Sequence, residues 1–476
     1  VDMVEQTLDP IASSLTFSGG ASGTDYPMTL GETAVIWTKR QGRETLELSD
    51  SELVFVGYGI DAPEYDWNDY QGLDVAGKTV VMLVNDPGFV TEDPALFNGK
   101  AMTYYGRWTY KFEEAARKGA AGAIIVHETE PAAYGWDVVS NSWSGAQADL
   151  VRPDGGADRT VLEGWISLST ARKLFAEAGL DFAQLSEMAS SPDFKPIDMG
   201  DLAASALLAQ SVDRKRSRNV VGVLPGAERP DEYVLFSAHW DHLGKKTDEK
   251  EGRRGQDFYR DDIFNGAVDN ATGVAAILEI AEAFAADRPA RSSLFVSVTL
   301  EESGLLGSAH YAENPTVPLS QIAGGINIDA PRPLGKTNDM VVIGFGASEL
   351  DTILADVLET QGRSVAPDPR PEAGLFYRSD HVEFAKKGVP MLYAKNGDDK
   401  VEGGVAAGAA FSAVYTRERY HKPFDEFDRN WDLDGLVEDV SALAEVGRRV
   451  AQSEDWPEWN DGSEFKAARD ASRSGQ

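Results

Sequence analysis

Three short apolar runs in the second half of the chain each end in side chains that can bind metal ions. The first run ends at His239, the second at Glu301 and Glu302, and the third at Asp329. We expect the runs to be β-strands at 233–238, 294–300 and 325–328. Because ligands of open α/β sheets bind beyond the carboxyl ends of the strands, these side chains should converge on one site. Imidazole and carboxylate groups together predict a metal centre there.

A fourth carboxylate, Asp269, lies between the first two strands on a turn flanked by glycines. This turn directly precedes a helix-periodic stretch at 274–286, in which Val274, Ile277, Leu278, Ala281 and Phe284 are expected to form one apolar stripe. Two interpretations of Asp269 follow from its position. It caps the helix, or its two carboxylate oxygens bridge two cations.

Six motifs occur in an order that resembles a known family. They are His239-Trp240-Asp241, 267–273, 301–308, 327–329, 379–381 and 420–423. Together they closely resemble the two-zinc exopeptidase family that includes bacterial leucyl aminopeptidases and glutamate carboxypeptidase (peptidase family M28). The resemblance covers about residues 210–450, and the joint set of motifs is far more specific than any one of them.

The resemblance implies two Zn²⁺ per chain and a role for each residue that matches the motifs. His239 and Asp329 would hold one zinc, Glu302 and His421 the other, and Asp269 would bridge them. Each ion then keeps room for a shared water, as catalytic zinc requires. The resemblance also implies that Glu301 is the general base and that Asp241 supports His239. Glu301 and Glu302 are adjacent at a strand end, so one can bind metal while the other carries a proton.

A different last ligand is possible, because His381 also lies in a motif of the family. We choose His421, since the family places its last ligand in the Tyr-His segment, and we expect Asp380, His381, Arg378 and Tyr420 to line the substrate site. His242 is expected to be a neighbour of the site and not a ligand, and His127 and His310 are expected to be structural or solvent-facing residues.

The elements that position these residues predict an α/β fold. Apolar runs at 322–328, 340–343 and 390–393 continue an alternation of strands with helical stretches such as 350–361, which is typical of a largely parallel sheet. The resemblance implies a mixed, largely parallel central sheet flanked by helices, of the zinc-peptidase/phosphorylase-hydrolase kind. It also implies an inserted, β-rich protease-associated domain, indicated by the runs around 53–60, 78–84 and 119–126.

We therefore expect four segments. Residues 1–49 would be an irregular N-terminal segment packed on the catalytic domain, and 50–207 the protease-associated domain. Residues 208–455 would be the zinc exopeptidase domain, and 456–476 a polar, frayed tail. The insert shows no cluster of metal ligands, so it would shape access or act as a structural support. A charged loop at 244–262 would be a lid or a surface excursion.

Composition limits the partners of this 476-residue chain. Its 45 Lys and Arg against 78 Asp and Glu give a net charge of −33, which makes nucleic acid and anionic membranes poor partners. Cysteine is absent, so disulfides and thiolate chemistry are excluded. No apolar run is long enough to span a membrane. The sequence begins at Val1, and we expect a secreted or periplasmic protein whose signal has been removed, although a trimmed sequence would also begin this way.

The leading hypothesis is a metallo-aminopeptidase acting on peptides with a free N-terminus. A carboxypeptidase or dipeptidase of the same family is an alternative, for which Arg332 and Arg378 could bind a terminal carboxylate. A glutaminyl cyclase, with one zinc, and a receptor-like protein without zinc are disfavoured because all five implied ligands and Glu301 are present. The oligomeric state is left open.

Overall fold

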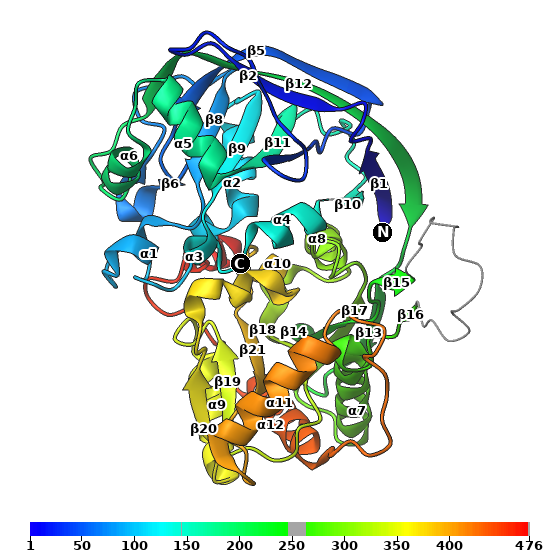
Figure 1. Cartoon of the computed structure of the whole chain (residues 1–476). Helices are drawn as coiled ribbons and strands as arrows, with labels where there is room; N and C mark the ends of the chain where they lie inside the picture. The colour runs from blue at the N-terminus through cyan, green and yellow to red at the C-terminus, as the bar shows by residue number, and fades with distance from the viewer. Residues whose placement is uncertain (144, 246–262, 475–476) are drawn as a thin grey trace, which may run out of the picture. The chain divides into compact units, whose positions relative to one another are not determined.

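The chain forms two compact units in the computed structural model, which describes residues 1–143, 145–245 and 263–474. Unit 1 comprises Val1, 217–369 and 378–476, and unit 2 comprises 2–216 and 370–377. Figure 1 colours both along the chain. Apart from the two-residue strand β15 (Gly244–Lys245), which pairs with β16 (Ile263–Phe264), the expected charged loop at 244–262 lies outside the described residues.

Unit 1 is built round a seven-stranded sheet. In spatial order its strands are β13 (Val220–Leu224), β17 (Arg291–Val298), β14 (Arg229–His239), β18 (Ile322–Asn327), β21 (Met391–Asn396), β19 (Asp339–Ile343) and β20 (Ser364–Pro367). Four neighbouring pairs are parallel, and only β13 with β17 and β19 with β21 are antiparallel. The expected mixed, largely parallel sheet is confirmed.

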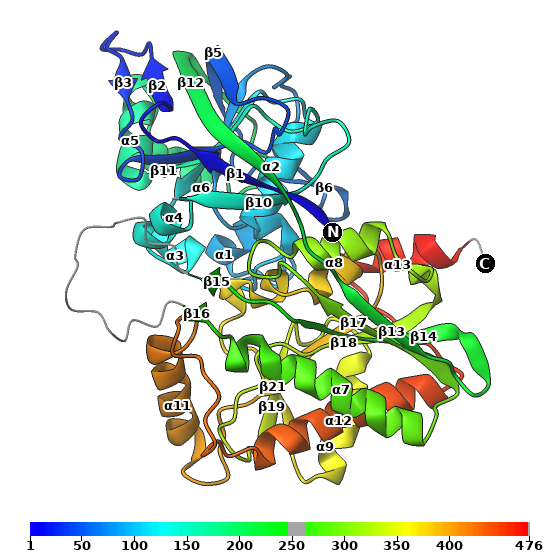
Figure 2. The same ribbon diagram turned by 90° about the vertical axis from the view of Figure 1, so that its right-hand side faces the viewer.

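Seven helices accompany this sheet in the described part of unit 1. They are α7 (Thr272–Ala286), α8 (Leu306–Glu313), α9 (Leu350–Thr360), α10 (His381–Ala385), α11 (Gly404–Glu418), α12 (Asp434–Gln452) and α13 (Lys466–Arg473). Helices α7, α9 and α12 bury their apolar faces against one side of the sheet (Figure 2). Burial of these apolar faces is the main stabilising contribution to the unit.

The centre of this core is Phe236 of β14, whose ring contacts those of Phe284 and Phe295. Helix α12 approaches the same ring through Gly447, where a Cβ atom would collide with it. On α7 the expected stripe is wrong at one position, since Leu278 is 64% exposed and Ile280 is buried instead. Apolar side chains three and four residues apart predict a face, but they do not fix how far round the helix burial extends.

Unit 2 contains a ten-stranded sheet. Its main path runs β10 (Ala146–Leu150), β1 (Asp2–Leu8), β12 (Ile197–Arg216), β5 (Thr45–Phe55), β8 (Thr79–Leu83), β9 (Gly122–His127), β11 (Leu162–Ser167) and β4 (Ala34–Trp37), with β2 (Ser14–Ser18) and β3 (Tyr26–Pro27) off this path. Its longer helices are α2 (Trp108–Arg117), α5 (Leu168–Glu177), α6 (Phe182–Met188) and α4 (Trp136–Ser142), and shorter ones are α1 (Pro87–Thr91) and α3 (Thr129–Ala132). The neighbours β5, β8, β9 and β11 are parallel.

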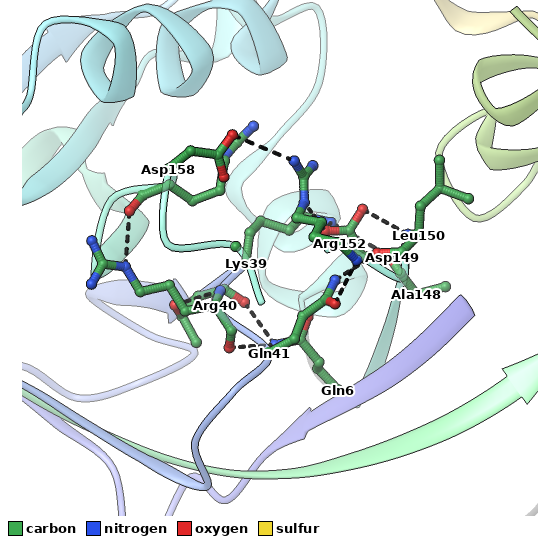
Figure 3. A network of polar contacts seen from close by, with 12 residues as sticks. Gln6, Lys39, Arg40, Gln41, Ala148, Asp149, Leu150, Arg152 and Asp158 are labelled. Atoms are coloured by element: carbon green, nitrogen blue, oxygen red, sulfur yellow. Dashed lines mark hydrogen bonds and ion pairs between the residues drawn. The ribbon is translucent and has the colours of Figure 1, made fainter. Parts of the chain in front are cut away.

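The expected place of residues 1–49 is wrong. Instead of packing on the catalytic domain, residues 2–49 belong to unit 2, where β1 and β2 pair with β12 and β4 pairs with β11. Polar contacts add to this attachment: Lys39 lies 3.9 Å from Asp149, and Gln41 donates to the carbonyl of Leu150 (Figure 3). These strands are short and are ordered by pairing with strands far away in the sequence, so their local pattern is too weak a signal on its own.

Unit 2 also takes a piece of chain from the second half of the sequence. Residues 370–377 belong to it, although residues on both sides of this segment belong to unit 1. The amide of Met102 donates to the carbonyl of Pro371 at 3.2 Å, and the rings of Tyr104 and Tyr377 are 6.1 Å apart. The boundaries of unit 2 therefore differ from the expected 50–207 at both ends.

The C-terminal residues 456–476 are not a frayed tail over the part that the structure describes. Trp459 and Phe465 are buried, and α13 follows them. The buried guanidinium of Arg469 donates to the carbonyls of Ile322 and Ala323, at the start of β18. Two aromatic side chains and one arginine thus hold a segment whose composition is mostly polar. Among the described helices, none combines the length and hydropathy needed to cross a bilayer.

Substituting Gly447→Ala should lower the free energy of unfolding by about 1–3 kcal/mol, because the added methyl group overpacks the ring of Phe236. The better helix propensity of alanine offsets only about 1 kcal/mol of this. Chemical denaturation followed by tryptophan fluorescence measures the change. Ser441→Ala, at an exposed position of α12, is the matched control and should be neutral. An equally stable Gly447→Ala variant would contradict this account of the packing.

Candidate metal centre

The expected metal-binding side chains meet at the carboxyl ends of three neighbouring parallel strands. His239 is the last residue of β14, Asp329 follows β18, and Glu302 follows β17. The Nε2 atom of His239 lies 3.1 Å from Oδ1 of Asp269 and 3.4 Å from Oδ1 of Asp329. The predicted convergence of the strand ends is therefore present in the structure.

A second group of ligand atoms lies on the other side of Asp269. Nε2 of His421 is 3.5 Å from Oδ2 of Asp269 and 3.1 Å from Oε2 of Glu302. Nδ1 of His242 is 2.6 Å from Oε1 of Glu302. Asp269 thus turns one carboxylate oxygen toward each group, which is the arrangement that a bridging ligand needs. His242, expected only as a neighbour, lies among the potential ligands.

The donors present fit zinc. In the described residues, two sets of potential ligand atoms lie within 4.8 Å of one another: His239 with Asp269 and Asp329, and His242 with Asp269 and Glu302. The Nδ1–H of His239 donates to the carbonyl of Asp241 at 2.9 Å, which leaves Nε2 as the ring nitrogen placed to bind a metal ion. That buried Nε2 atom and Oε1 of Glu302 make no well-aligned hydrogen bond. Imidazole nitrogens and carboxylate oxygens with free lone pairs are ligands that zinc takes.

Comparison with known proteins agrees with this geometry. The model of Peptidase family M28 matches residues 219–444. Residues 219–444 belong to peptidase family M28. The family's segment therefore contains His239, Asp269, Glu302, Asp329 and His421.

Curated relatives match about a quarter of this chain. A probable zinc metalloprotease of Pyrenophora teres f. teres (strain 0-1) is 34% identical over 110 residues, which cover 23% of this chain and 22% of that protein. Aminopeptidase NAALADL1 of Rattus norvegicus is 32% identical over 132 residues, which cover 26% of this chain and 15% of that protein. The matches thus span less than a quarter of the length of these relatives.

Solved structures match over more of the chain at low identity. An aminopeptidase from Aneurinibacillus sp. strain AM-1 is 17% identical, with 96% of this chain and 88% of that chain covered and a TM-score of 0.43. A zinc aminopeptidase from Bacillus subtilis is 16% identical, with 95% and 85% covered and a TM-score of 0.39.

Asp241 acts in the M28 segment in a way that differs from the expectation. Only its backbone carbonyl contacts His239. Its carboxylate Oδ2 accepts hydrogen bonds from the hydroxyl of Thr299 at 2.8 Å and from the amide of Leu300 at 2.7 Å. Leu300 has a positive φ of 59° and immediately precedes Glu301. The Asp241 carboxylate therefore fixes the turn that directs Glu301 and Glu302.

Two side chains that sequence reasoning did not single out hold the turn that carries Asp269. The carboxylate of Asp425 is fully buried and accepts from the amides of Val268 and Asp269, at 3.0–3.2 Å. Asn270 donates to the carbonyl of Ile328 and accepts from the amide of Ala330, so it joins this turn to the loop of Asp329. Asp425 follows His421 by four residues, and this closeness to a predicted ligand is the sequence feature that could have indicated its role.

Asp329 is positioned by a chain of buried polar side chains. The hydroxyl of Ser379 donates to its Oδ2 at 2.5 Å, and Ser379 in turn accepts from the amide group of Asn327 at 2.7 Å. The carbonyl of that amide group accepts from the hydroxyl of Ser237. These bonds run from β14 across β18 to Ser379, the residue before Asp380. The 379–381 motif therefore helps to orient Asp329, in addition to the substrate contact expected of it.

The two adjacent glutamates differ strongly in charge state. Burial raises the pKa of Glu301 well above its usual value, and the nearby carboxylate of Asp329 adds to the shift. Burial acts the same way on Glu302, but contacts with His242 and His421 outweigh it and lower its pKa to about 2. Neighbouring titratable groups with separated pKa values are typical of an acid and base beside a ligand. Glu301 is therefore the group suited to carry a proton.

The expected substrate-site residues take different positions. Burial raises the pKa of Asp380 to about 7, and its Oδ1 accepts from the hydroxyl of Ser308 at 2.6 Å. His381 is fully buried 4.9 Å from the ring of Tyr393, and burial lowers its pKa to about 3, so it stays neutral. Tyr420 stacks on His421 at 3.8 Å. Arg378 is half-buried. The described ligand groups do not include His381.

Substituting Asp425→Asn should weaken zinc binding about 10–100-fold, because a neutral amide replaces the carboxylate that orients the Asp269 turn. The measurement is a competitive titration of the metal-stripped protein against a chromogenic chelator. Asp428→Asn, which changes the same charge in the same loop without contacting the Asp269 turn, is the control. Equal affinities for both variants would show that Asp425 does not position the site.

Proposed function

We propose that this chain is a zinc-dependent aminopeptidase that hydrolyses the N-terminal bond of peptides. The observation that carries the proposal is the carboxylate of Asp269, which lies between two sets of imidazole and carboxylate ligands with the buried Glu301 beside them. Membership of residues 219–444 in peptidase family M28 supports peptide hydrolysis. A single-zinc cyclase would not need a second ligand group.

His239 and Asp329 would hold one zinc ion, Glu302 and His421 the other, and Asp269 would touch both, with His242 at the second position as well. When bound, the two ions supply a water of lowered pKa and positive charge that stabilises an oxyanion. The residues that hold them are fixed by hydrogen bonds from outside the ligand set, through Asp241, Asn270, Ser379 and Asp425.

Glu301 is the general base in this proposal. Its carboxylate accepts a proton from the attacking water and returns it to the leaving amine nitrogen. The surroundings suit both steps, because burial and the charge of Asp329 favour the protonated form that must exist between them. Glu302, with its lowered pKa, stays ionised.

The acidic surroundings favour a substrate with a free α-ammonium group. Glu301, Asp380 and the ligand carboxylates lie within one small region of a chain whose net charge is −33. Arg332 is one of the two arginines that could hold a substrate carboxylate. Its guanidinium is instead occupied by the hydroxyl of Ser412, the carbonyl of Asn396 and, at 3.7 Å, Asp398. This engagement favours an aminopeptidase over a carboxypeptidase.

Unit 2 is proposed to be the protease-associated domain, with a role in access of peptides rather than in chemistry. Supporting this, the described residues of unit 2 include no group of three or more close metal ligands. Its central strands β5, β8, β9 and β11 form a buried parallel core.

Substituting Glu301→Gln should lower kcat by about 10²–10⁴-fold while zinc content and fold are retained, because one residue serves both proton steps. Hydrolysis of an amino-acyl nitroanilide, with zinc measured by elemental analysis, tests this. Glu313→Gln removes an exposed carboxylate of α8 that pairs with Lys387, and should leave kcat unchanged. Nearly full activity of Glu301→Gln would require a different base.

Blocking the substrate's amine should abolish cleavage, whereas blocking its carboxylate should not. The comparison uses a short peptide in three forms: free, N-acetylated and C-amidated. The acidic site attracts the ammonium group of the substrate. Arg332 already contacts groups of its own chain and does not bind the substrate carboxylate, so only acetylation should prevent cleavage. Cleavage that survives acetylation and fails after amidation would assign the protein as a carboxypeptidase instead.

A further inference from the structure

Over residues 405–414, helix α11 presents an apolar outer face. Its inner side packs through the buried Gly408 and Tyr415, where Gly408 lies against the backbone of Asp398. Six residues point outward and are exposed: Val405, Ala406, Ala409, Ala410, Ala413 and Val414. Val405 is 61% exposed and Val414 is 42% exposed, so no described residue covers this face. In Figure 2, α11 lies at the left edge of unit 1, and in Figure 1 it is on the side that faces the viewer.

Such a face is unusual for a surface helix. The outward positions of a helix that borders a core normally carry polar or charged residues. Here residues 404–416 contain no charged side chain at all, in a chain of net charge −33. A contiguous exposed apolar patch on a folded protein marks an interaction site.

The residue types on this face are arranged symmetrically along the helix. Val405 and Val414, Ala406 and Ala413, and Ala409 and Ala410 are equally spaced about a point between residues 409 and 410. Two copies of α11 packed antiparallel across that point would therefore place each of these residues against a residue of the same type. A two-fold interface requires such self-complementarity, because the same patch serves both partners.

The charges that flank the face follow the same symmetry. Glu402 and Arg417 are equally distant from the midpoint, so an antiparallel pair brings Glu402 of each copy toward Arg417 of the other. Within one chain Arg417 contacts Glu418 at 2.6 Å, but both side chains are mostly exposed. An exposed pair of this kind contributes little and is readily exchanged. Over most of the remaining acidic surface, two copies repel one another.

The C-terminal end of α11 offers a place for the residues that precede the helix in a second copy. A cavity of about 880 Å³ there is lined by Arg417, Phe424 and Phe427, among other residues of 417–430. Phe424 and Phe427 are 68% and 67% exposed. The two-fold arrangement brings Val401 of the other copy, itself 58% exposed, to this end of the helix.

From the apolar face, its symmetry and the flanking charges, we propose that α11 is a self-association surface whose occupant is α11 of a second copy of this chain. The two helices pack antiparallel, with Ala409 and Ala410 at the centre and a Glu402–Arg417 ion pair at each end. One helix pair with its flanks is smaller than the about 1,200–2,000 Å² of stable interfaces, so the dimer should dissociate at micromolar concentrations.

Sedimentation of the full chain over a concentration series tests the proposal. The wild-type chain should change from monomer to dimer, and Ala409→Glu should weaken dimerisation at least about 100-fold, because two carboxylates then meet near the axis. Leu278→Glu adds the same charge at an exposed apolar position of α7 and should leave the equilibrium unchanged. A wild-type chain that stays monomeric, or a dimer that Ala409→Glu does not affect, overturns the proposal.

Charge reversal tests the orientation of the helices. Glu402→Arg and Arg417→Glu alone should each weaken the dimer about tenfold, and the double variant should restore it, because the pair at each end is then reversed but intact. A double variant no stronger than the single ones contradicts the antiparallel arrangement.

A third readout does not depend on the weak equilibrium. The natural chain has no cysteine, so Ala409→Cys introduces a single thiol near the two-fold axis. A short bifunctional thiol reagent should link two such chains and should not link Leu278→Cys chains. Equal crosslinking of both variants would indicate random collision and contradict the interface.

Discussion

Repulsion among carboxylates is the constraint on which the catalytic unit depends. Glu301, Glu302, Asp269 and Asp329 are brought together at one edge of a sheet, where burial reduces the screening of their charges by solvent. The two outcomes of this crowding are visible in the pKa values: Glu301 favours its protonated form, and the pKa of His421 rises to about 9, since its ion pairs with Asp269 and Glu302 outweigh the effect of burial. A cluster that takes up protons in this way is one that lacks positive charge, which divalent cations would supply.

Holding such a cluster requires hydrogen bonds from groups that are not themselves ligands. The carboxylates of Asp241 and Asp425 bind backbone amides of the turns before Glu301 and at Asp269, and so orient these residues without sharing their position. The hydroxyl of Ser379 orients Asp329 differently, by donating to its carboxylate. The scaffold thus uses hydrogen bonds from residues outside the ligand set to hold carboxylates that electrostatic repulsion alone would push apart.

Strand ends were predictable from sequence, and the groups that support them were not. Runs of β-branched and apolar residues that end in His239, Glu301 and Asp329 carry their own signal, because period and composition are local. The contact of Asp425 with Asp269 depends on a separation of more than 150 residues that no local pattern encodes. The predictions for the strands before residue 50 and for the segment of Trp459 and Arg469 were wrong for the same reason. These segments are ordered by tertiary contacts and not by their composition. His242 was predicted to be only a neighbour of the site, because its position next to Asp241 in the sequence does not predict its contact with Glu302.

The small segment 370–377 has a consequence for how the protein is made. Unit 2 ends its main stretch at residue 216, yet it is incomplete until residues 370–377 have left the ribosome. Most of unit 1 must therefore be synthesised before the amide of Met102 can donate its hydrogen bond to the carbonyl of Pro371. Folding cannot proceed as two independent events in chain order, as it does in simple tandem proteins. A gene fragment that stops at residue 216 would encode unit 2 with a gap in its surface where this segment belongs.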